Sequence, residues 1–165
     1  MNNKEKADLI AEEMICNLKN NVLQESAETD KAKLLSLLFK ALAFSAEKHT
    51  KQRRKDIDKT PYINHPISLA NILAQRWVID ENVLCAAILH DTIEDTFATY
   101  ETIKNEFGDE VAELVDGVTK ISVFENTADA NSKVENFRKL ILATSKDIRV
   151  LLVKIADRLH NMRTI

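Results

Sequence analysis

Chain-breaking residues are nearly absent from this sequence. Its 165 residues include only two glycines and two prolines, and 45% of them are hydrophobic. Glycine and proline are the residues that most strongly interrupt regular structure, so their scarcity predicts an all-α fold. The length is that of one ordinary domain, large enough to bury a real hydrophobic core. We therefore expect a single compact multi-helix bundle of about eight helices.

The charge and the cysteine pattern narrow the class of protein. A net charge of −3 gives no electrostatic reason to expect nucleic acid or a membrane surface as a partner. No apolar run approaches membrane-spanning length, and the first residues lack the apolar region of a secretory signal. Cys16 and Cys85 do not form a CxxC pair. Two reduced thiols in a cytoplasmic protein are the expectation.

Hydrophobic periodicity and capping residues divide the chain into helices. Asp80 is expected to cap one helix, and Gly108 to end another. Residues 122–131 have the composition of a loop. Residues 1–33 are expected to form a helical extension packed on a main domain over residues 34–165. Helices are predicted at about 5–24, 31–49, 65–74, 81–93, 99–107, from 109 to beyond 118, after a capping box at 132–135, and from 147 towards the end.

Two histidines and two aspartates form a candidate set of metal ligands. His90 and Asp91 follow directly on the apolar stretch 83–89, where ionisable groups are costly to bury unless a partner compensates them. His65 lies at the entrance of a predicted helix because proline follows it, and Asp157 lies inside the last helix. Imidazole and carboxylate ligands together suit a divalent transition ion.

Helical spacing places further polar groups beside this set. Glu94 and Asp95 lie four residues after His90 and Asp91, so each pair shares a face if the helix continues that far. Asp157, Asn161 and Thr164 have the spacing of one polar line along the last helix. Such a line suits a ligand held next to an ion.

Each of these residues, taken alone, has an ordinary alternative role. A histidine before proline more often caps or packs than binds metal, and His49 and His160 are expected only to pack. Acidic residues on a charged helix usually face solvent or pair with a base. The basic run 48–55 is most often a solvated face. The order of the residues along the chain therefore carries more weight than any one of them.

That order, a histidine, a His-Asp pair and a later aspartate, resembles the HD phosphohydrolase superfamily of all-helical, metal-dependent enzymes. More narrowly, the chain resembles the hydrolase domain of RelA/SpoT homologues, the bacterial enzymes that make and degrade the alarmone (p)ppGpp. The resemblance covers about residues 35–165. It rests on the segments YINHP at 62–66, LHDTIEDT at 89–96, FG at 107–108, VDGVTK at 115–120, NFRK at 136–139, SKDIRV at 145–150 and KIADRLHNMRT at 154–164.

The resemblance implies an HD-type domain over 34–165 and a role for each candidate. The family's metal, usually Mn²⁺, has ligands that match His65, His90, Asp91 and Asp157. The acidic pair that assists the attack of water matches Glu94 and Asp95. Residues that contact the nucleotide match Arg54 and Lys55, and those that hold its guanosine part match Asn161 and Thr164. The implied reaction removes the 3′-pyrophosphate from (p)ppGpp and gives GDP or GTP plus pyrophosphate.

Two departures from the family pattern leave alternatives open. The loop between Lys55 and Pro61 is longer than in many long members and is more similar to that of the small alarmone hydrolases. The chain ends at Ile165, directly after the Asp157 segment, so we expect a domain truncated at its C-terminus. The alternatives are a phosphatase of another nucleotide and a non-catalytic remnant that binds a nucleotide or a partner. No synthetase motif is present, so ppGpp synthesis is not predicted.

Overall fold

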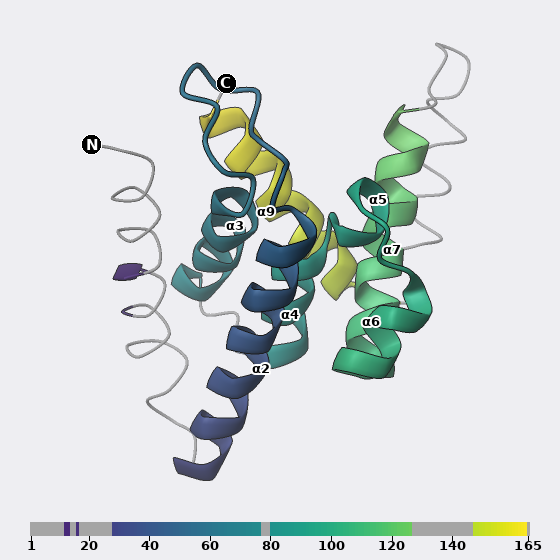
Figure 1. Cartoon of the computed structure of the whole chain (residues 1–165). Coiled ribbons are helices and arrows are strands. Elements are labelled where there is room, and N and C mark those ends of the chain that lie inside the picture. The colour runs from purple at the N-terminus through teal and green to yellow at the C-terminus, as the bar shows by residue number, and fades with distance from the viewer. Residues whose placement is uncertain (1–11, 14–15, 17–27, 77–79, 127–146, 165) are drawn as a thin grey trace.

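The structure, a computed structural model, describes residues 12–13, 16, 28–76, 80–126 and 147–164. Within these ranges the regular elements are helices, apart from one isolated antiparallel β-bridge between Arg53 and Pro61. The predicted all-α class is confirmed for this part of the chain (Figure 1). The helices are α2 (Glu28–Lys48), α3 (Asn64–Gln75), α4 (Glu81–Leu89), α5 (Thr92–Asp95), α6 (Tyr100–Phe107), α7 (Asp109–Asn126) and α9 (Arg149–Arg163).

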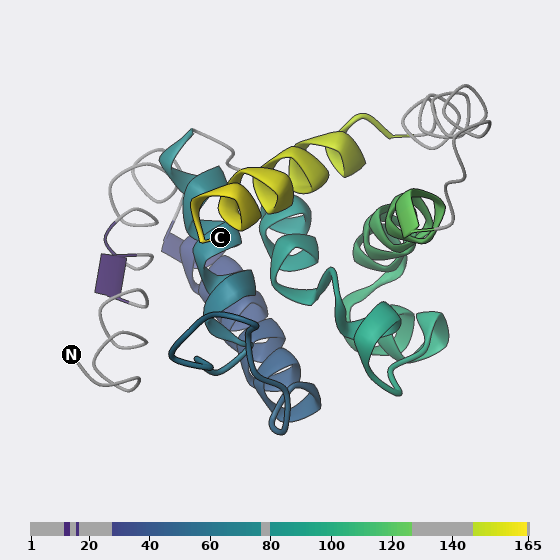
Figure 2. The ribbon, with the colours of Figure 1, turned by 90° about the horizontal axis from the view of Figure 1, so that it is seen from above.

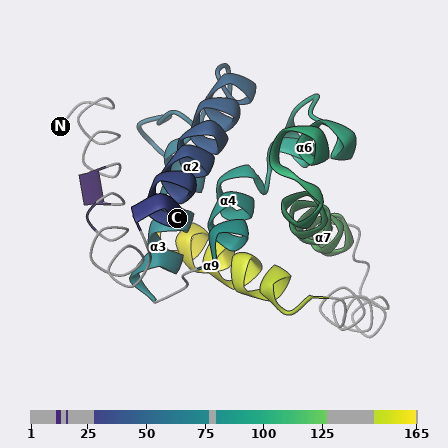
Figure 3. The same ribbon diagram turned by 90° about the horizontal axis from the view of Figure 1, so that it is seen from below.

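Helix α4 forms the centre of the bundle. It packs against α2, α3, α7 and α9, and Figure 3 shows it enclosed among them. Every residue from Val83 to Leu89 is at most 1% exposed. A helix that is apolar on all sides is stable only when other elements cover all of its sides. The apolar stretch before the His-Asp pair therefore fixes the end of α4 in the middle of the molecule.

Residues at the helix ends act as their types predict. The Asp80 carboxylate accepts hydrogen bonds from the backbone N–H groups of Asn82 and Val83, at 2.9 and 3.2 Å, which satisfies donors that the first turn of α4 leaves free. Gly108 follows α6 with a φ of 92°, a left-handed conformation that glycine adopts without strain. Both predicted boundaries are confirmed.

Two predicted boundaries are wrong. The helix predicted over 81–93 ends at Leu89, and Thr92–Asp95 form the separate short helix α5. The segment 122–131, predicted as a loop, is helical up to Asn126 because α7 continues to that residue. The remainder of that segment, the capping box at 132–135 and most of the extension over 1–33 lie outside the described residues. The number of about eight helices and the division at residue 33 stay predictions.

Helix α9 brings the late part of the sequence back to the loop that follows α2. It packs on α3, α4 and α7, and its C-terminal end lies beside the loop 49–61 (Figures 1 and 2). Residues near positions 54, 65 and 161 thereby meet at one end of the bundle. Among the described residues, no helix combines the length and the apolarity needed to cross a membrane.

Candidate metal centre and adjoining pocket

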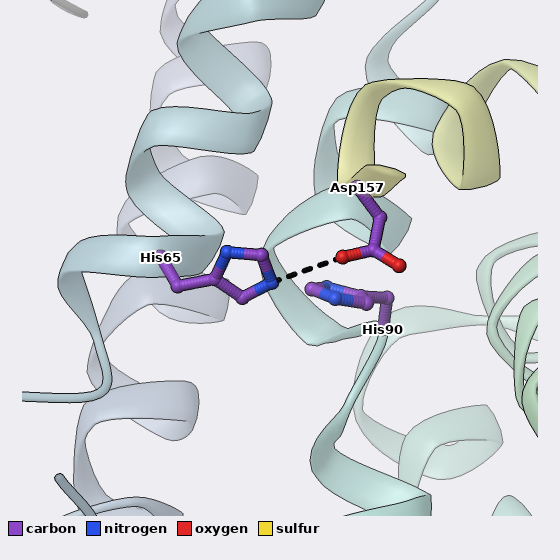
Figure 4. Close-up of side chains that lie close together, drawn as sticks. All are labelled: His65, His90 and Asp157. Carbon is purple, nitrogen blue, oxygen red and sulfur yellow. Dashed lines mark ion pairs between the residues drawn. The ribbon is translucent and has the colours of Figure 1, made fainter. Parts of the chain in front are cut away.

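Three ligand-type side chains converge from three different elements. His65 comes from the first turn of α3, His90 directly follows α4, and Asp157 comes from α9 (Figure 4). One ligand atom from each lies within 4.8 Å of the others. The Nε2 atom of His65 is 3.3 Å from Oδ1 of Asp157. All three residues are buried, so the group could hold an ion away from bulk water.

A hydrogen bond at the far side of the His90 ring turns its Nε2 atom towards this centre. Nδ1 of His90 lies 2.8 Å from the carbonyl oxygen of Ala87. A carbonyl only accepts, so Nδ1 is the donor and Nε2 is the ring nitrogen that faces the centre. Nε2 of His90 is buried and makes no well-aligned hydrogen bond. Metal-binding histidines have this arrangement, with the second ring nitrogen fixed by an outer partner. The residues present therefore fit a divalent metal ion.

Asp91 lies at the edge of the same centre. Its Oδ2 atom is 2.9 Å from Nε2 of His90 and 3.7 Å from Nε2 of His65. The same oxygen accepts a short hydrogen bond from the hydroxyl of Tyr62. Asp91 is not part of the mutually close group of three residues. The structure thus brings all predicted ligands together, with Asp91 in a more peripheral position.

The electrostatic state of the site favours a positive charge. Burial alone would lower the pKa of His90, but the neighbouring Asp91 carboxylate raises it overall. Burial alone would raise the pKa of Asp91 and of Asp157, but histidine contacts hold both pKa values below the usual range. Both carboxylates therefore stay ionised in a largely dry environment. An added cation would offset this buried negative charge.

The predicted acidic pair lies on α5 and not on a continuation of α4. Burial, followed by the charges of Asp91 and Asp95, raises the pKa of Glu94. Glu94 also shares a hydrogen bond with Ser122 of α7. Asp95 accepts a hydrogen bond of 2.8 Å from Nε2 of Gln52. The two acids therefore stand in different surroundings, although they are adjacent in the sequence.

A pocket of about 860 Å³ adjoins the centre. Arg54 spans part of it: Nη2 donates to Oδ1 of Asn161 at 3.0 Å and to Oγ1 of Thr164 at 3.1 Å. Nδ2 of Asn161 donates in turn to Oδ1 of Asp157 at 2.6 Å. The pocket is lined by Gln52, Arg53, Arg54, Lys55, Asp56, Ile57, Asp58, Tyr62, Asp95, Asn161 and Thr164. All predicted nucleotide-contacting residues thus line one cavity beside the candidate metal centre.

Three further residues contact this site and were not predicted. Tyr62 donates to Asp91. Buried Lys154 has its Nζ 3.3 Å from Oδ2 of Asp157. Nδ1 of His160 lies 2.8 Å from Nδ1 of His65, and burial lowers the pKa of His160 to about 4. Each is three residues from a candidate ligand, a spacing that places helical residues side by side and that gave a sequence signal for Lys154 and His160.

Comparison with known proteins agrees with this geometry. The profile of the HD domain family matches residues 41–165. The chain belongs to the HD domains of the RelA/SpoT family. A GTP pyrophosphokinase of Myxococcus xanthus is 49% identical over 134 residues, which are 79% of this chain and 17% of that protein. A guanosine-3′,5′-bis(diphosphate) 3′-pyrophosphohydrolase of Haemophilus influenzae is 53% identical over 105 residues, 64% of this chain and 15% of that protein.

A solved structure extends the likeness to three dimensions. It is a metazoan orthologue of SpoT, described as hydrolysing ppGpp and acting in starvation responses. The two chains are 40% identical, with a TM-score of 0.63 over 77% of this chain and 68% of the other. By contrast, the chain spans only about one sixth of the length of the curated relatives, whose names include both GTP pyrophosphokinases and pyrophosphohydrolases.

Proposed function

We propose that this protein is a Mn²⁺-dependent hydrolase that removes the 3′-pyrophosphate from (p)ppGpp and gives GDP or GTP plus pyrophosphate. The observation that carries the proposal is the buried group of His65, His90 and Asp157 beside a pocket with basic lining residues. The names of relatives matched over this domain support the substrate. Within the cell, we keep the expectation of a cytoplasmic protein that acts on a small nucleotide.

The metal would be held by His65, His90 and Asp157, with Asp91 as the fourth ligand. Two nitrogen and two oxygen donors suit Mn²⁺ as well as other divalent transition ions. When bound, such an ion polarises a phosphoryl oxygen and makes water more acidic. Lys154 and Asn161 would orient Asp157, because they contact its two carboxylate oxygens separately.

Glu94 and Asp95 are assigned to proton handling. Water attacks the phosphorus atom that is bonded to the 3′ oxygen. The bond between this phosphorus and the 3′ oxygen breaks, and the 3′ oxygen takes up a proton as pyrophosphate leaves. Glu94 suits the removal of a proton from water because its pKa is raised towards neutral pH, where a general base works best. Asp95 lines the pocket, so it would meet the substrate there.

The basic and amide groups of the pocket are assigned to the nucleotide. Arg54 has a planar, permanently charged side chain that can stack on a base or pair with phosphate oxygens, and its guanidinium lies 6.0 Å from the ring centre of Tyr62. Lys55 is exposed at the pocket wall and would offset phosphate charge. Asn161 and Thr164, which now accept from Arg54, would bond to the nucleoside after Arg54 turns towards it.

Turnover of ppGpp by the purified protein with Mn²⁺ tests the proposal, with products separated by chromatography. We expect GDP and pyrophosphate. Arg54→Ala should raise KM more than it lowers kcat and should retain Mn²⁺ binding, while exposed Arg76→Ala serves as the matched control. Cleavage of another nucleotide but not of ppGpp would show a different phosphatase. Binding without any cleavage would show a non-catalytic remnant.

A further inference from the structure

No step of the proposed hydrolysis involves the buried side chain of His49. It is 3% exposed at the end of α2, and its ring stacks on Tyr62, with centroids 4.7 Å apart and planes at 30°. Its Nδ1 atom lies 2.6 Å from Oε1 of Gln52. Sequence reasoning assigned His49 to packing alone, but a buried histidine with a polar contact on one side and a pocket residue on the other has a more specific use.

Chemistry fixes the direction of the contacts around Gln52. A carboxylate oxygen accepts, so the group of Gln52 that faces Oδ2 of Asp95 at 2.8 Å is the amide Nε2. The amide oxygen of Gln52 therefore faces His49, and Nδ1 of His49 must be the donor. The result is a directional chain from His49 through Gln52 to Asp95. Neither amide flip nor the other histidine tautomer would satisfy both contacts.

Asp95 depends on such a contact for its orientation. It is exposed, and it belongs to the four-residue helix α5, so little packing restrains its side chain. Gln52 is half-buried, and its backbone is bonded on both sides: its N–H donates to the carbonyl of His49 at 2.9 Å, and its carbonyl accepts from the N–H of Tyr62 at 3.2 Å. An anchored amide therefore holds a carboxylate that would otherwise rotate.

We propose that Gln52 is a positioning residue for Asp95 and that His49 sets the orientation of the Gln52 amide. This inference rests on the proposed function, because it gives the orientation of Asp95 a consequence for hydrolysis. His49 also supports the ring of Tyr62, whose hydroxyl donates to Asp91. One buried imidazole would thus support a residue on each side of the reaction centre, one in the pocket and one at the metal.

Kinetics of Gln52 variants separate positioning from substrate binding. Gln52→Ala should lower kcat by about 10- to 100-fold, by analogy with the loss of outer partners of metal ligands, with KM and Mn²⁺ affinity near wild type. Gln52→Glu keeps the acceptor for His49 but replaces the donor to Asp95 with a like charge, so its kcat should fall at least as far. Gln75→Ala is the control. Gln75 lies on α3, away from the site, and its Nε2 donates to Oε1 of Glu13 at a distance of 2.9 Å.

Variants of His49 test the second half of the chain. His49→Asn retains a side-chain N–H donor and loses the ring, whereas His49→Phe retains the ring on Tyr62 and loses the donor. We expect kcat to fall about tenfold in His49→Phe and by less than that in His49→Asn. In the wild type, ¹⁵N NMR should find His49 protonated at Nδ1, with a chemical shift that changes in Gln52→Ala.

The outcomes distinguish the inference from the proposed function. Lack of ppGpp turnover by the wild type would refute both. Wild-type turnover combined with an unchanged kcat in Gln52→Ala, or a raised KM with unchanged kcat, would refute the inference alone. So would equal kcat values for the two His49 variants when both melt as the wild type does, or a wild-type His49 protonated only at Nε2.

Discussion

Replacement of Gly117 by alanine tests the packing of α7 against α9. Gly117 lies inside α7, and a Cβ atom there would be 2.8 Å from Cγ2 and 3.3 Å from Cγ1 of Val150 on α9. Carbon atoms do not approach that closely without displacement. Val150 is 3% exposed, and its branched side chain has one preferred rotamer in a helix. The neighbour therefore cannot turn away without strain.

Two opposing terms set the size of the effect. Alanine in place of glycine stabilises a helix interior by about 1 kcal/mol, while overpacking a tight contact costs about 1–3 kcal/mol. We expect Gly117→Ala to lower the free energy of unfolding by about 1 kcal/mol, as the balance of these terms. In the Val150→Ala background the obstructing methyl groups are gone. The same glycine change should then raise the free energy of unfolding by about 1 kcal/mol.

Equilibrium unfolding in urea measures the free energy of unfolding of the wild type, the two single variants and the double variant. Val150→Ala alone should cost about 2 kcal/mol, from two lost methyl groups and the cavity they leave. The sign reversal of the glycine change between the two backgrounds gives a coupling of about 2 kcal/mol, well above the error for distant sites. A stabilising Gly117→Ala in the wild type, or the same effect in both backgrounds, would refute the close approach of α7 and α9.

Three further predictions concern the site and the core. Mn²⁺ at about a hundred times its Kd should stabilise the wild type by about 2.7 kcal/mol. It should stabilise the variants His90→Ala and Asp157→Ala much less, and equal shifts in melting temperature would contradict the ligand assignment. Glu94→Gln combined with Asp95→Asn should retain Mn²⁺ binding and lose most hydrolysis, whereas loss of the metal, measured by titration, would make the pair ligands. Burial raises the pKa of Cys85 to about 12, so a thiol reagent at neutral pH should modify exposed Cys16 in the folded protein and both cysteines in denaturant; equal rates in the folded state would contradict the burial of Cys85.

The helix ends that depend on local chemistry could be predicted, and those that depend on side-chain competition could not. Asp80 and Gly108 act through their own backbone neighbours, so their residue types are sufficient evidence. At the end of α4, Nδ1 of His90 and Oγ1 of Thr92 donate to the carbonyl oxygens of Ala87 and Leu89. Such bonds compete with the helical pattern. Hydrophobic periodicity does not indicate these side-chain hydrogen bonds, so the sequence predicted one helix through Ile93.

The continuation of α7 past residue 121 has a tertiary cause. Ser122 donates to the carbonyl oxygen of Val118 at 3.3 Å and accepts from Nζ of Lys154 at 2.8 Å. A serine in a polar stretch has weak helical preference by itself, but a buried contact with another helix outweighs that preference. Because the partner lies 32 positions later in the chain, no local pattern could have indicated it.

For the site, residue types and order indicated the candidate ligands, but their supporting contacts required the fold. His65, His90, Asp91 and Asp157 follow an order along the chain that resembles a known family, whereas Gln52 and Tyr62 gain their partners only when the loop 49–61 folds back on α9 and α5. The structure also shows that hydrogen bonds connect the candidate metal centre with the pocket. One residue common to both is Asn161, through its side-chain amide.

Asn161 joins the two parts because each end of its amide is already engaged. Nδ2 donates to Oδ1 of Asp157, the oxygen that faces His65, while Oδ1 accepts from Arg54 in the pocket. An ion that draws on Oδ1 of Asp157 weakens its bond to the amide, and a nucleotide that attracts Arg54 frees the other end of the same amide. Since both events act on one side chain, the proposed function predicts that metal binding and nucleotide binding influence each other, and thermodynamic linkage makes that influence equal in both directions.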